Sequence, residues 1–117
     1  MRWVLAVLCA LAFTGCRWSE ARYFDEYAEV DCTFLMDCLD PAVLNFLGWD
    51  TLDDCIQDKG TQAVTEAEGC EYNPRAARPC VKGIEDMTCP ADGEEPEYPP
   101  ICETVFDCEG DTGDSGE

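Results

Sequence analysis

The chain has 117 residues, of which 26 are acidic, seven are basic and none is histidine, giving a formal net charge of −19. So acidic a chain lacks the Lys/Arg surface that phosphate contacts need, which argues against nucleic acid as a partner. The charge also argues against electrostatic docking on an anionic bilayer and favours a protein partner with a basic surface. The absence of histidine excludes Ser-His-Asp and Cys-His catalysis and His-ligated zinc.

The N-terminal segment has the three parts of an export signal. Arg2 supplies a positive charge, residues 3–13 form an eleven-residue apolar stretch, and Thr14 and Gly15 are small. Eleven residues in a helix rise about 16 Å, roughly half of the hydrocarbon thickness of a bilayer. We therefore predict that residues 1–15 are a cleaved signal peptide and not a permanent transmembrane anchor.

The cut site resembles the bacterial lipobox, in which small residues precede a cysteine that receives lipid and becomes the new N-terminus. Here Cys16 would be that cysteine, with residues 16–19 as anchor and tether, although Phe13 stands where leucine is usual. The resemblance implies a membrane-anchored lipoprotein. Arg17 implies the outer membrane, because aspartate at that position favours inner-membrane retention in enteric bacteria. The alternative is an ordinary signal cut at nearly the same place, which would leave Cys16 without lipid.

Cysteine parity supports lipidation. The chain has ten cysteines, of which Cys9 leaves with the leader and Cys16 would carry the lipid. The remaining eight form an even set, as a disulfide framework requires, whereas ordinary cleavage strands one thiol in an oxidising compartment. The eight are Cys32, Cys38, Cys55, Cys70, Cys80, Cys89, Cys102 and Cys108. The sequence does not choose among their pairings, but disulfides typically add about 2–4 kcal/mol each, which a small core needs.

The longest helical pattern runs over residues 20–38, behind Ser19 as the N-cap. Its apolar positions recur at steps of three and four residues: Tyr23, Phe24, Tyr27, Val30, Phe34, Leu35 and Cys38. We interpret the aromatic members of this stripe as core and not as a ligand cradle. Trp49 is also assigned to the core, and Trp18 to the membrane interface, where indoles are favoured.

Two shorter helical patterns follow. Asp40-Pro41, a cap followed by proline at the first helical position, predicts a short helix that ends near Gly48. Asp50 is the predicted cap of the next helix, which ends at Gly60. The pattern over 61–69 fits either a further helical turn or a loop.

The second half of the chain repeats the cap-and-proline signal. Asn73-Pro74 predicts a helix that ends near Thr88, in which Gly83 costs up to about 1 kcal/mol relative to alanine. Residues 90–100 are rich in Pro, Gly and Glu and predict an irregular connector. A last short helix is predicted over 101–107.

No segment shows the alternation typical of a strand. The predicted fold class is therefore all-α: a small disulfide-stapled helical domain over residues 20–108, with four to five short helices and up to four disulfides. The tail 109–117 has no apolar residue and is predicted to be an acidic, disordered segment.

Two segments share a Cys-x₅-Cys spacing, Cys32 with Cys38 and Cys102 with Cys108. On a helix, residues six apart lie about 9 Å apart along the axis and point about 120° apart. A disulfide needs Cα atoms within about 7 Å. We therefore predict that the two cysteines of each pair bond to different elements and staple the helices to one another.

The segment that begins at Cys70 combines a cysteine, an aromatic residue two positions on, Asn-Pro and an alanine pair, followed by spaced cysteines. Tyr72, Asn73-Pro74 and Ala76-Ala77 supply these features. The pattern resembles one in uncharacterised cysteine-rich lipoproteins of myxobacteria-like Gram-negative bacteria. Arg78-Pro79 departs from it, and a proline inside a helix is expected to kink it. The resemblance implies export and lipidation and implies no activity.

Acidic clusters are the remaining candidates for chemistry. Three acids lie at a predicted helix start, where they already favour the positive end of the helix dipole: Asp50, Asp53 and Asp54. Four more lie near the C-terminus: Asp107, Glu109, Asp111 and Asp114. Neither cluster has the twelve-residue spacing of an EF-hand calcium loop. We interpret both as solvated surface, and we predict no metal, no cofactor and no catalytic residue.

The leading hypothesis is a non-enzymatic, lipid-anchored envelope protein with a binding or structural role. Lipid on Cys16 would attach it to the outer membrane, and a protein with a basic surface is the expected partner. The alternative is a secreted helical cysteine-rich effector or inhibitor without lipid. The sequence identifies neither a ligand nor an oligomeric state.

Overall fold

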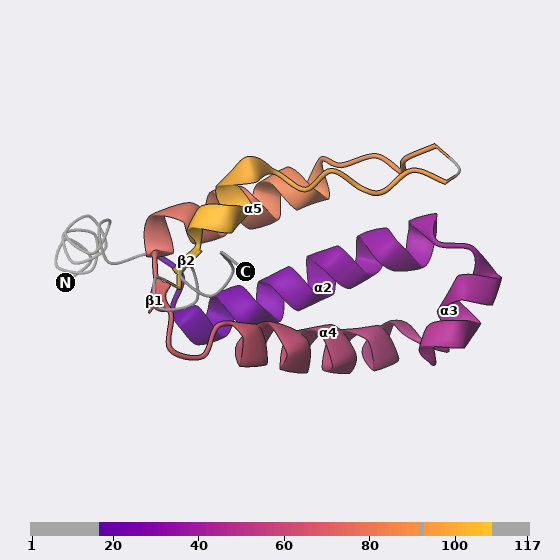
Figure 1. Ribbon diagram of the computed structural model, residues 1–117, viewed down its shortest axis with the longest axis horizontal. Coiled ribbons are helices and arrows are strands. Elements are labelled where there is room, and N and C mark those ends of the chain that lie inside the picture. Colours follow the sequence, from indigo (N-terminus) through magenta and orange to yellow (C-terminus); the bar gives the residue numbers. More distant parts are fainter. Residues whose placement is uncertain (1–16, 92, 109–117) are drawn as a thin grey trace, which may run out of the picture.

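The computed structural model describes residues 17–91 and 93–108 (Figure 1). The predictions for the signal peptide 1–15, for lipid on Cys16 and for the tail 109–117 fall outside these residues. Among the helices that are described, none is long and apolar enough to cross a membrane.

Helix α2 is the centre of the fold (Figure 1). It spans Glu20–Cys38 and packs against α4 (Leu52–Glu66) on one side and α5 (Pro74–Glu85) on the other. The short helix α3 (Pro41–Leu47) turns the chain between α2 and α4 at one end of the molecule. With four α-helices in the described part of the chain, the predicted all-α class is confirmed.

A 3₁₀ helix and one pair of strands lie at the end opposite to α3 (Figure 1). The 3₁₀ helix η1 (Pro100–Thr104) packs on α5, and strand β2 (Phe106–Asp107) pairs antiparallel with β1 (Glu71–Tyr72). The predicted helix over 101–107 is therefore present only as this short 3₁₀ helix, which ends at Thr104, and the prediction of no strand is wrong. Two-residue strands are too short to produce an alternating pattern, and they form because tertiary contacts bring two distant segments together.

Local signals set the starts of α2, α3 and α5 as predicted. The Ser19 hydroxyl accepts a hydrogen bond from the Arg22 amide at 3.2 Å, and the Asp40 carboxylate accepts one from the Ala42 amide at 2.8 Å. Asn73 caps α5 in the same way, and proline follows both Asp40 and Asn73. These side chains replace the helical partners that first-turn N–H groups lack, so nearby residues suffice to predict the boundaries.

Helix α4 differs from its prediction at both ends. Its N-cap is Thr51 and not Asp50: the Thr51 hydroxyl accepts from the Asp54 amide at 3.2 Å, and the Asp54 carboxylate accepts from the Thr51 amide at 3.0 Å. This reciprocal pair is a capping box. The helix also continues past Gly60 to Glu66, so much of the stretch 61–69 is helical. Gly60 lies against Ala28 of α2, and packing between the helices outweighs the low helix propensity of glycine.

Helix α5 ends at Glu85 and not near Thr88, because the chain turns there into the connector that returns to η1. The connector is irregular in its described residues, as predicted. A Cβ atom on Gly83 would lie 2.6 Å from Cγ of Pro99, so the glycine that weakens α5 is what lets the connector approach it. Pro79 lies within α5 without ending the helix.

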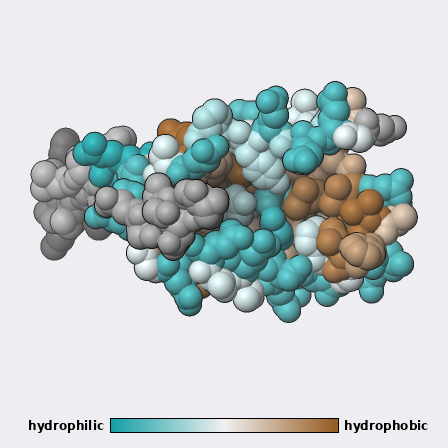
Figure 2. All heavy atoms as spheres, in the orientation of Figure 1, coloured by the Kyte–Doolittle hydropathy of each residue, from teal (hydrophilic) through white to brown (hydrophobic). Residues whose placement is uncertain are grey.

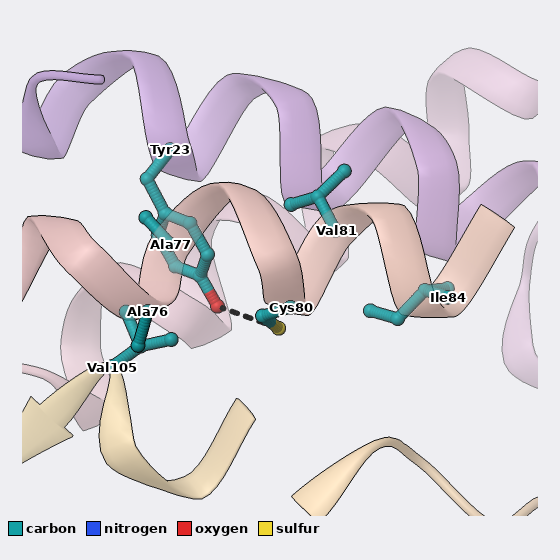
Figure 3. Packing of buried hydrophobic residues seen from close by; sticks show 7 residues of the cluster. All are labelled: Tyr23, Ala76, Ala77, Cys80, Val81, Ile84 and Val105. Carbon is teal, nitrogen blue, oxygen red and sulfur yellow. Dashed lines mark hydrogen bonds between the residues drawn. The ribbon is translucent and has the colours of Figure 1, made fainter. Parts of the chain in front are cut away.

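Two clusters of buried residues form the core. Figure 3 shows the first cluster, which joins α2, α5 and the residue before β2: Tyr23, Ala76, Ala77, Cys80, Val81, Ile84 and Val105. The second cluster lies nearer to α3: Cys32, Phe34, Leu35, Trp49 and Cys55. Tyr23, Phe34 and Trp49 are therefore core residues, as predicted. Phe24 and Tyr27 are half-buried and pack against the first cluster.

Four disulfides link the described elements: Cys32–Cys55, Cys38–Cys89, Cys70–Cys108 and Cys80–Cys102. The prediction that neither Cys-x₅-Cys pair closes on itself is confirmed. The two cysteines of α2 reach α4 and the connector, and the other pair reaches α5 and the residue before β1. The bonds join residues 22 to 51 positions apart, so each restricts the unfolded chain over a long loop.

Candidate functional site

The residues that the sequence singled out have structural partners. All eight cysteines between residues 32 and 108 are disulfide-bonded, so none of them is a thiol nucleophile. Asp54 completes the capping box of α4, and Asp53 accepts a hydrogen bond from the side-chain amide of Gln57 at 3.0 Å. Trp18, predicted to lie at a membrane interface, packs against the first core cluster with the Arg22 guanidinium 5.0 Å from its ring centroid.

The acidic clusters form no ion site in the described ranges. Residues 17–91 and 93–108 contain no group of three or more His, Cys, Asp or Glu side chains placed to hold a metal ion. Of the C-terminal cluster only Asp107 lies within these ranges; Glu109, Asp111 and Asp114 lie outside them. The acids at the start of α4 are used as helix caps and side-chain acceptors instead.

A buried carboxylate, which sequence analysis missed, is the most unusual polar group of the fold. Asp31 of α2 is 0% exposed. Its Oδ1 accepts a hydrogen bond from the Tyr98 hydroxyl at 2.5 Å, and Nζ of Lys59 lies 3.4 Å from Oδ2. The sequence contained an indication of this burial, because Asp31 follows Tyr27 by four residues and precedes Phe34 by three and so lies on the same helix face. A carboxylate on that apolar stripe has to be buried with partners.

The cluster of Asp31, Lys59 and Tyr98 joins α2, α4 and the connector. Burial and then the hydrogen bond to Asp31 raise the pKa of Tyr98 above its usual value. Burial, followed by the charges of Asp31 and Glu66, raises the pKa of Tyr27 to about 12. Both phenols are therefore neutral at physiological pH and supply neither a base nor a nucleophile. The cluster fixes the connector on the two helices and offers no reactive group.

An apolar surface at the α3 end is the strongest candidate for function. We define the α3 patch as the exposed residues Val43, Phe46, Leu47 and Leu52. Helix α3 buries none of its residues, and Phe46 is 87% exposed. Val43, Phe46 and Leu47 lie three and four positions apart, so they share one helix face. Figure 2 shows hydrophobic atoms gathered at the end of the molecule where Figure 1 places α3.

The surroundings of the α3 patch are acidic. Residues 23–58 run from α2 through α3 into α4 and contain ten acidic residues but no Lys or Arg. Asp37 and Asp40 precede the patch in the chain, Asp50 and Asp53 flank Leu52, and all four acids are exposed. An apolar surface in a negative field selects a partner that combines apolar contacts with positive charge.

The α3 patch is also far from the start of the described chain. Arg17 and Ser19 precede α2, whereas α3 follows its other end (Figure 1). Helix α2 has 19 residues, and at about 1.5 Å per residue its two ends lie about 27 Å apart. A tether at the N-terminal end would therefore hold the patch at the distal end of the domain.

Comparison of the chain with protein-family models, with curated proteins and with solved structures finds no match.

Proposed function

We propose that the protein is a lipid-anchored envelope protein without enzymatic activity, which holds a partner protein at its distal end through the α3 patch. The observation that carries the proposal is the exposure of that patch, with Phe46 87% exposed on a helix that has no fully buried residue. Gathered apolar side chains on a small domain typically mark an interaction site, and aromatic residues are prominent among binding hot spots.

The four disulfides indicate an oxidising, extracytoplasmic location. Within that location we assign the protein to the outer membrane, attached through lipid on Cys16 and sorted by Arg17. The export signal of residues 1–15 supports this assignment, as does the resemblance to uncharacterised cysteine-rich lipoproteins. Cysteine use supports it as well, because the eight cysteines after Cys16 all pair with one another.

The partner that we propose carries an apolar groove rimmed by Lys or Arg. Charge complementarity with Asp37, Asp40 and Asp50 favours such a rim. A second copy of this chain would bring the same acids to the interface, and like charges there oppose association. An anionic bilayer is disfavoured for the same reason, and an anchor at Cys16 would leave the α3 patch about one length of α2 from the membrane.

Lipidation is tested by metabolic labelling with a fatty acid in a bacterial host that processes lipoproteins. We expect wild-type protein to take up the label and fractionate with the outer membrane. Cys16→Ser should take up no label, while the matched control Cys9→Ser should be labelled like wild type. Unlabelled wild-type protein that is secreted normally would instead support the alternative, a secreted helical cysteine-rich effector or inhibitor.

Docking is tested by comparing Phe46→Asp with Val64→Asp in capture from envelope extracts. Val64 is exposed on α4 outside the patch, so its variant controls for an added charge at an exposed apolar position. We expect Phe46→Asp to lose the captured protein, Val64→Asp to keep it, and wild-type capture to weaken as salt screens the charged rim. Equal capture by both variants contradicts the proposal. A concentration-dependent dimer that Phe46→Asp abolishes would identify the partner as a second copy.

A further inference from the structure

A concave surface elsewhere on the molecule involves different residues from the α3 patch. It is a groove of about 240 Å³ between α2, α4, the connector and the segment that contains η1 and β2. Five aromatic rings line it: Tyr23, Phe24, Tyr27, Tyr98 and Phe106. The volume is smaller than that of sites for drug-sized ligands, so the groove suits a ligand or head group of few heavy atoms.

The aromatic lining is held in place by the surrounding structure. The rings of Phe24 and Phe106 stack with centroids 5.5 Å apart and 10° between their planes. Both pack against the first core cluster. On the connector side, Tyr98 is fixed by its hydrogen bond to the buried Asp31. Aromatic faces carry partial negative charge, so a rigid set of them attracts cations that have an apolar surface.

The charges of the groove have one sign. The carboxylates of Glu66 and Glu103 belong to its lining, both residues are exposed, and no Lys or Arg is among the lining residues. The buried Asp31, hydrogen-bonded to the lining residue Tyr98, is paired with Lys59, so Glu66 and Glu103 are the charges that face a ligand. Asp31 and Glu66 contribute, after burial, to the raised pKa of Tyr27, which places that ring in a negative field.

We infer that this groove binds a small quaternary ammonium compound of the choline type. A quaternary ammonium has no N–H to satisfy, so it can leave water and lay its methyl groups against the rings. A primary ammonium would lose hydrogen bonds to water in the same place. In residues 17–91 and 93–108 no group of three or more His, Cys, Asp or Glu side chains is placed to hold a metal ion. The site and its ligand do not depend on the proposed docking at the α3 patch.

The two carboxylates also select among quaternary compounds. Glu66 and Glu103 attract the ammonium but repel an attached phosphate. We therefore expect the ligand to be a free cationic solute and not the head group of a phosphocholine lipid. A titration series that compares choline with phosphocholine distinguishes a free cationic solute from a lipid head group as the ligand.

The experiment is a calorimetric titration of the oxidised full-length mature protein with four probes. Choline should bind saturably, and its neutral carbon isostere 3,3-dimethylbutan-1-ol should bind at least about tenfold more weakly, because the charge provides the cation–π attraction. Ethanolamine and phosphocholine should also bind more weakly than choline. The inference is overturned if choline shows no saturable binding, if the neutral isostere binds equally well, or if phosphocholine binds tighter than choline.

Substitutions distinguish choline binding at this groove from a general attraction of cations to the acidic domain. Glu66→Gln and Glu103→Gln each should weaken choline binding several-fold, and Phe24→Leu should abolish it. Glu95→Gln is the matched control, since Glu95 is exposed on the connector and outside the groove lining. Near-ultraviolet circular dichroism verifies that each variant is folded. If Glu95→Gln weakens binding as much as Glu66→Gln does, the attraction belongs to the whole acidic domain and the inference fails.

Discussion

The two ends of α2 use apolar side chains in opposite ways. At the β1–β2 end, large apolar residues such as Tyr23 and Val105 are buried in a core shared with α5. At the α3 end, the equally large Phe46 faces water. Two disulfides connect each end to the rest of the fold, so cross-linking does not account for the difference. Both ends have a core cluster, so the difference is that the α3 end also leaves large apolar side chains uncovered on its surface.

The largest test of this comparison is a pair of truncations. Ile84→Ala should lower the free energy of unfolding by about 2–5 kcal/mol, because it removes a side chain that is 1% exposed and leaves a cavity. Phe46→Ala should change it by no more than about 0.5 kcal/mol, since little burial is lost. Urea unfolding of both variants measures the difference. A cost for Phe46→Ala close to that for Ile84→Ala would show that α3 is packed in solution.

The next test removes one hydroxyl from the cluster that fixes the connector. Tyr98→Phe should lower the free energy of unfolding by about 1.5–3 kcal/mol, because Oδ1 of the buried Asp31 loses its donor. In an Asp31→Asn variant, Tyr98→Phe should lower the free energy of unfolding by less, because residue 31 then has no carboxylate that needs the Tyr98 hydroxyl as a donor. The double-mutant cycle, measured by chemical unfolding, isolates the interaction. Equal costs in both backgrounds would assign the effect of Tyr98 to packing alone.

Alanine substitutions at two glycines within helices should change the stability of the protein in opposite directions. Gly83→Ala should destabilise the protein by about 1–3 kcal/mol, because the new Cβ would lie 2.6 Å from Pro99. Gly60→Ala should stabilise it by up to about 1 kcal/mol, since its Cβ would meet Ala28 at an ordinary 3.9 Å and alanine favours the helix. Thermal unfolding of the two variants measures both signs. Stabilisation by both would mean that the connector does not rest on α5.

The smallest expected effect is the change in stability at alkaline pH. The free energy of unfolding should stay constant until the tyrosines ionise. All four tyrosines lie outside the α3 end, and burial is the first cause that raises the pKa of each above 10. The folded state therefore keeps its phenolic protons where the unfolded chain releases them. Their contribution to stability is complete below about pH 10 and declines as pH rises toward the folded pKa of Tyr27, about 12.

Ultraviolet absorbance of tyrosinate, followed during a pH titration, measures this shift. The folded protein should show little tyrosinate at pH 10, whereas the protein unfolded in denaturant should be about half ionised there. Early ionisation in the folded protein would contradict the packing that we describe at the β1–β2 end.

Local sequence determined much of the fold by itself. The bounds of α2 and α3 follow from Ser19, from Asp40-Pro41 and from Gly48, which adopts the left-handed conformation at the end of α3. These signals act within one helical turn, so neighbouring residues contain all the information. The rule that a Cys-x₅-Cys pair on a helix cannot close on itself is local geometry as well.

Only the tertiary structure decided which cysteines pair, where α4 and α5 end, and that β1 meets β2. Each of these depends on residues far apart in the chain, such as Gly83 beneath Pro99. The same holds for the two surfaces that we propose for binding. Exposure of Phe46 and burial of Asp31 are properties of the packed molecule, because a helical stripe predicts which side chains share a face but not whether that face is covered. What covers a face is settled by long-range contacts alone.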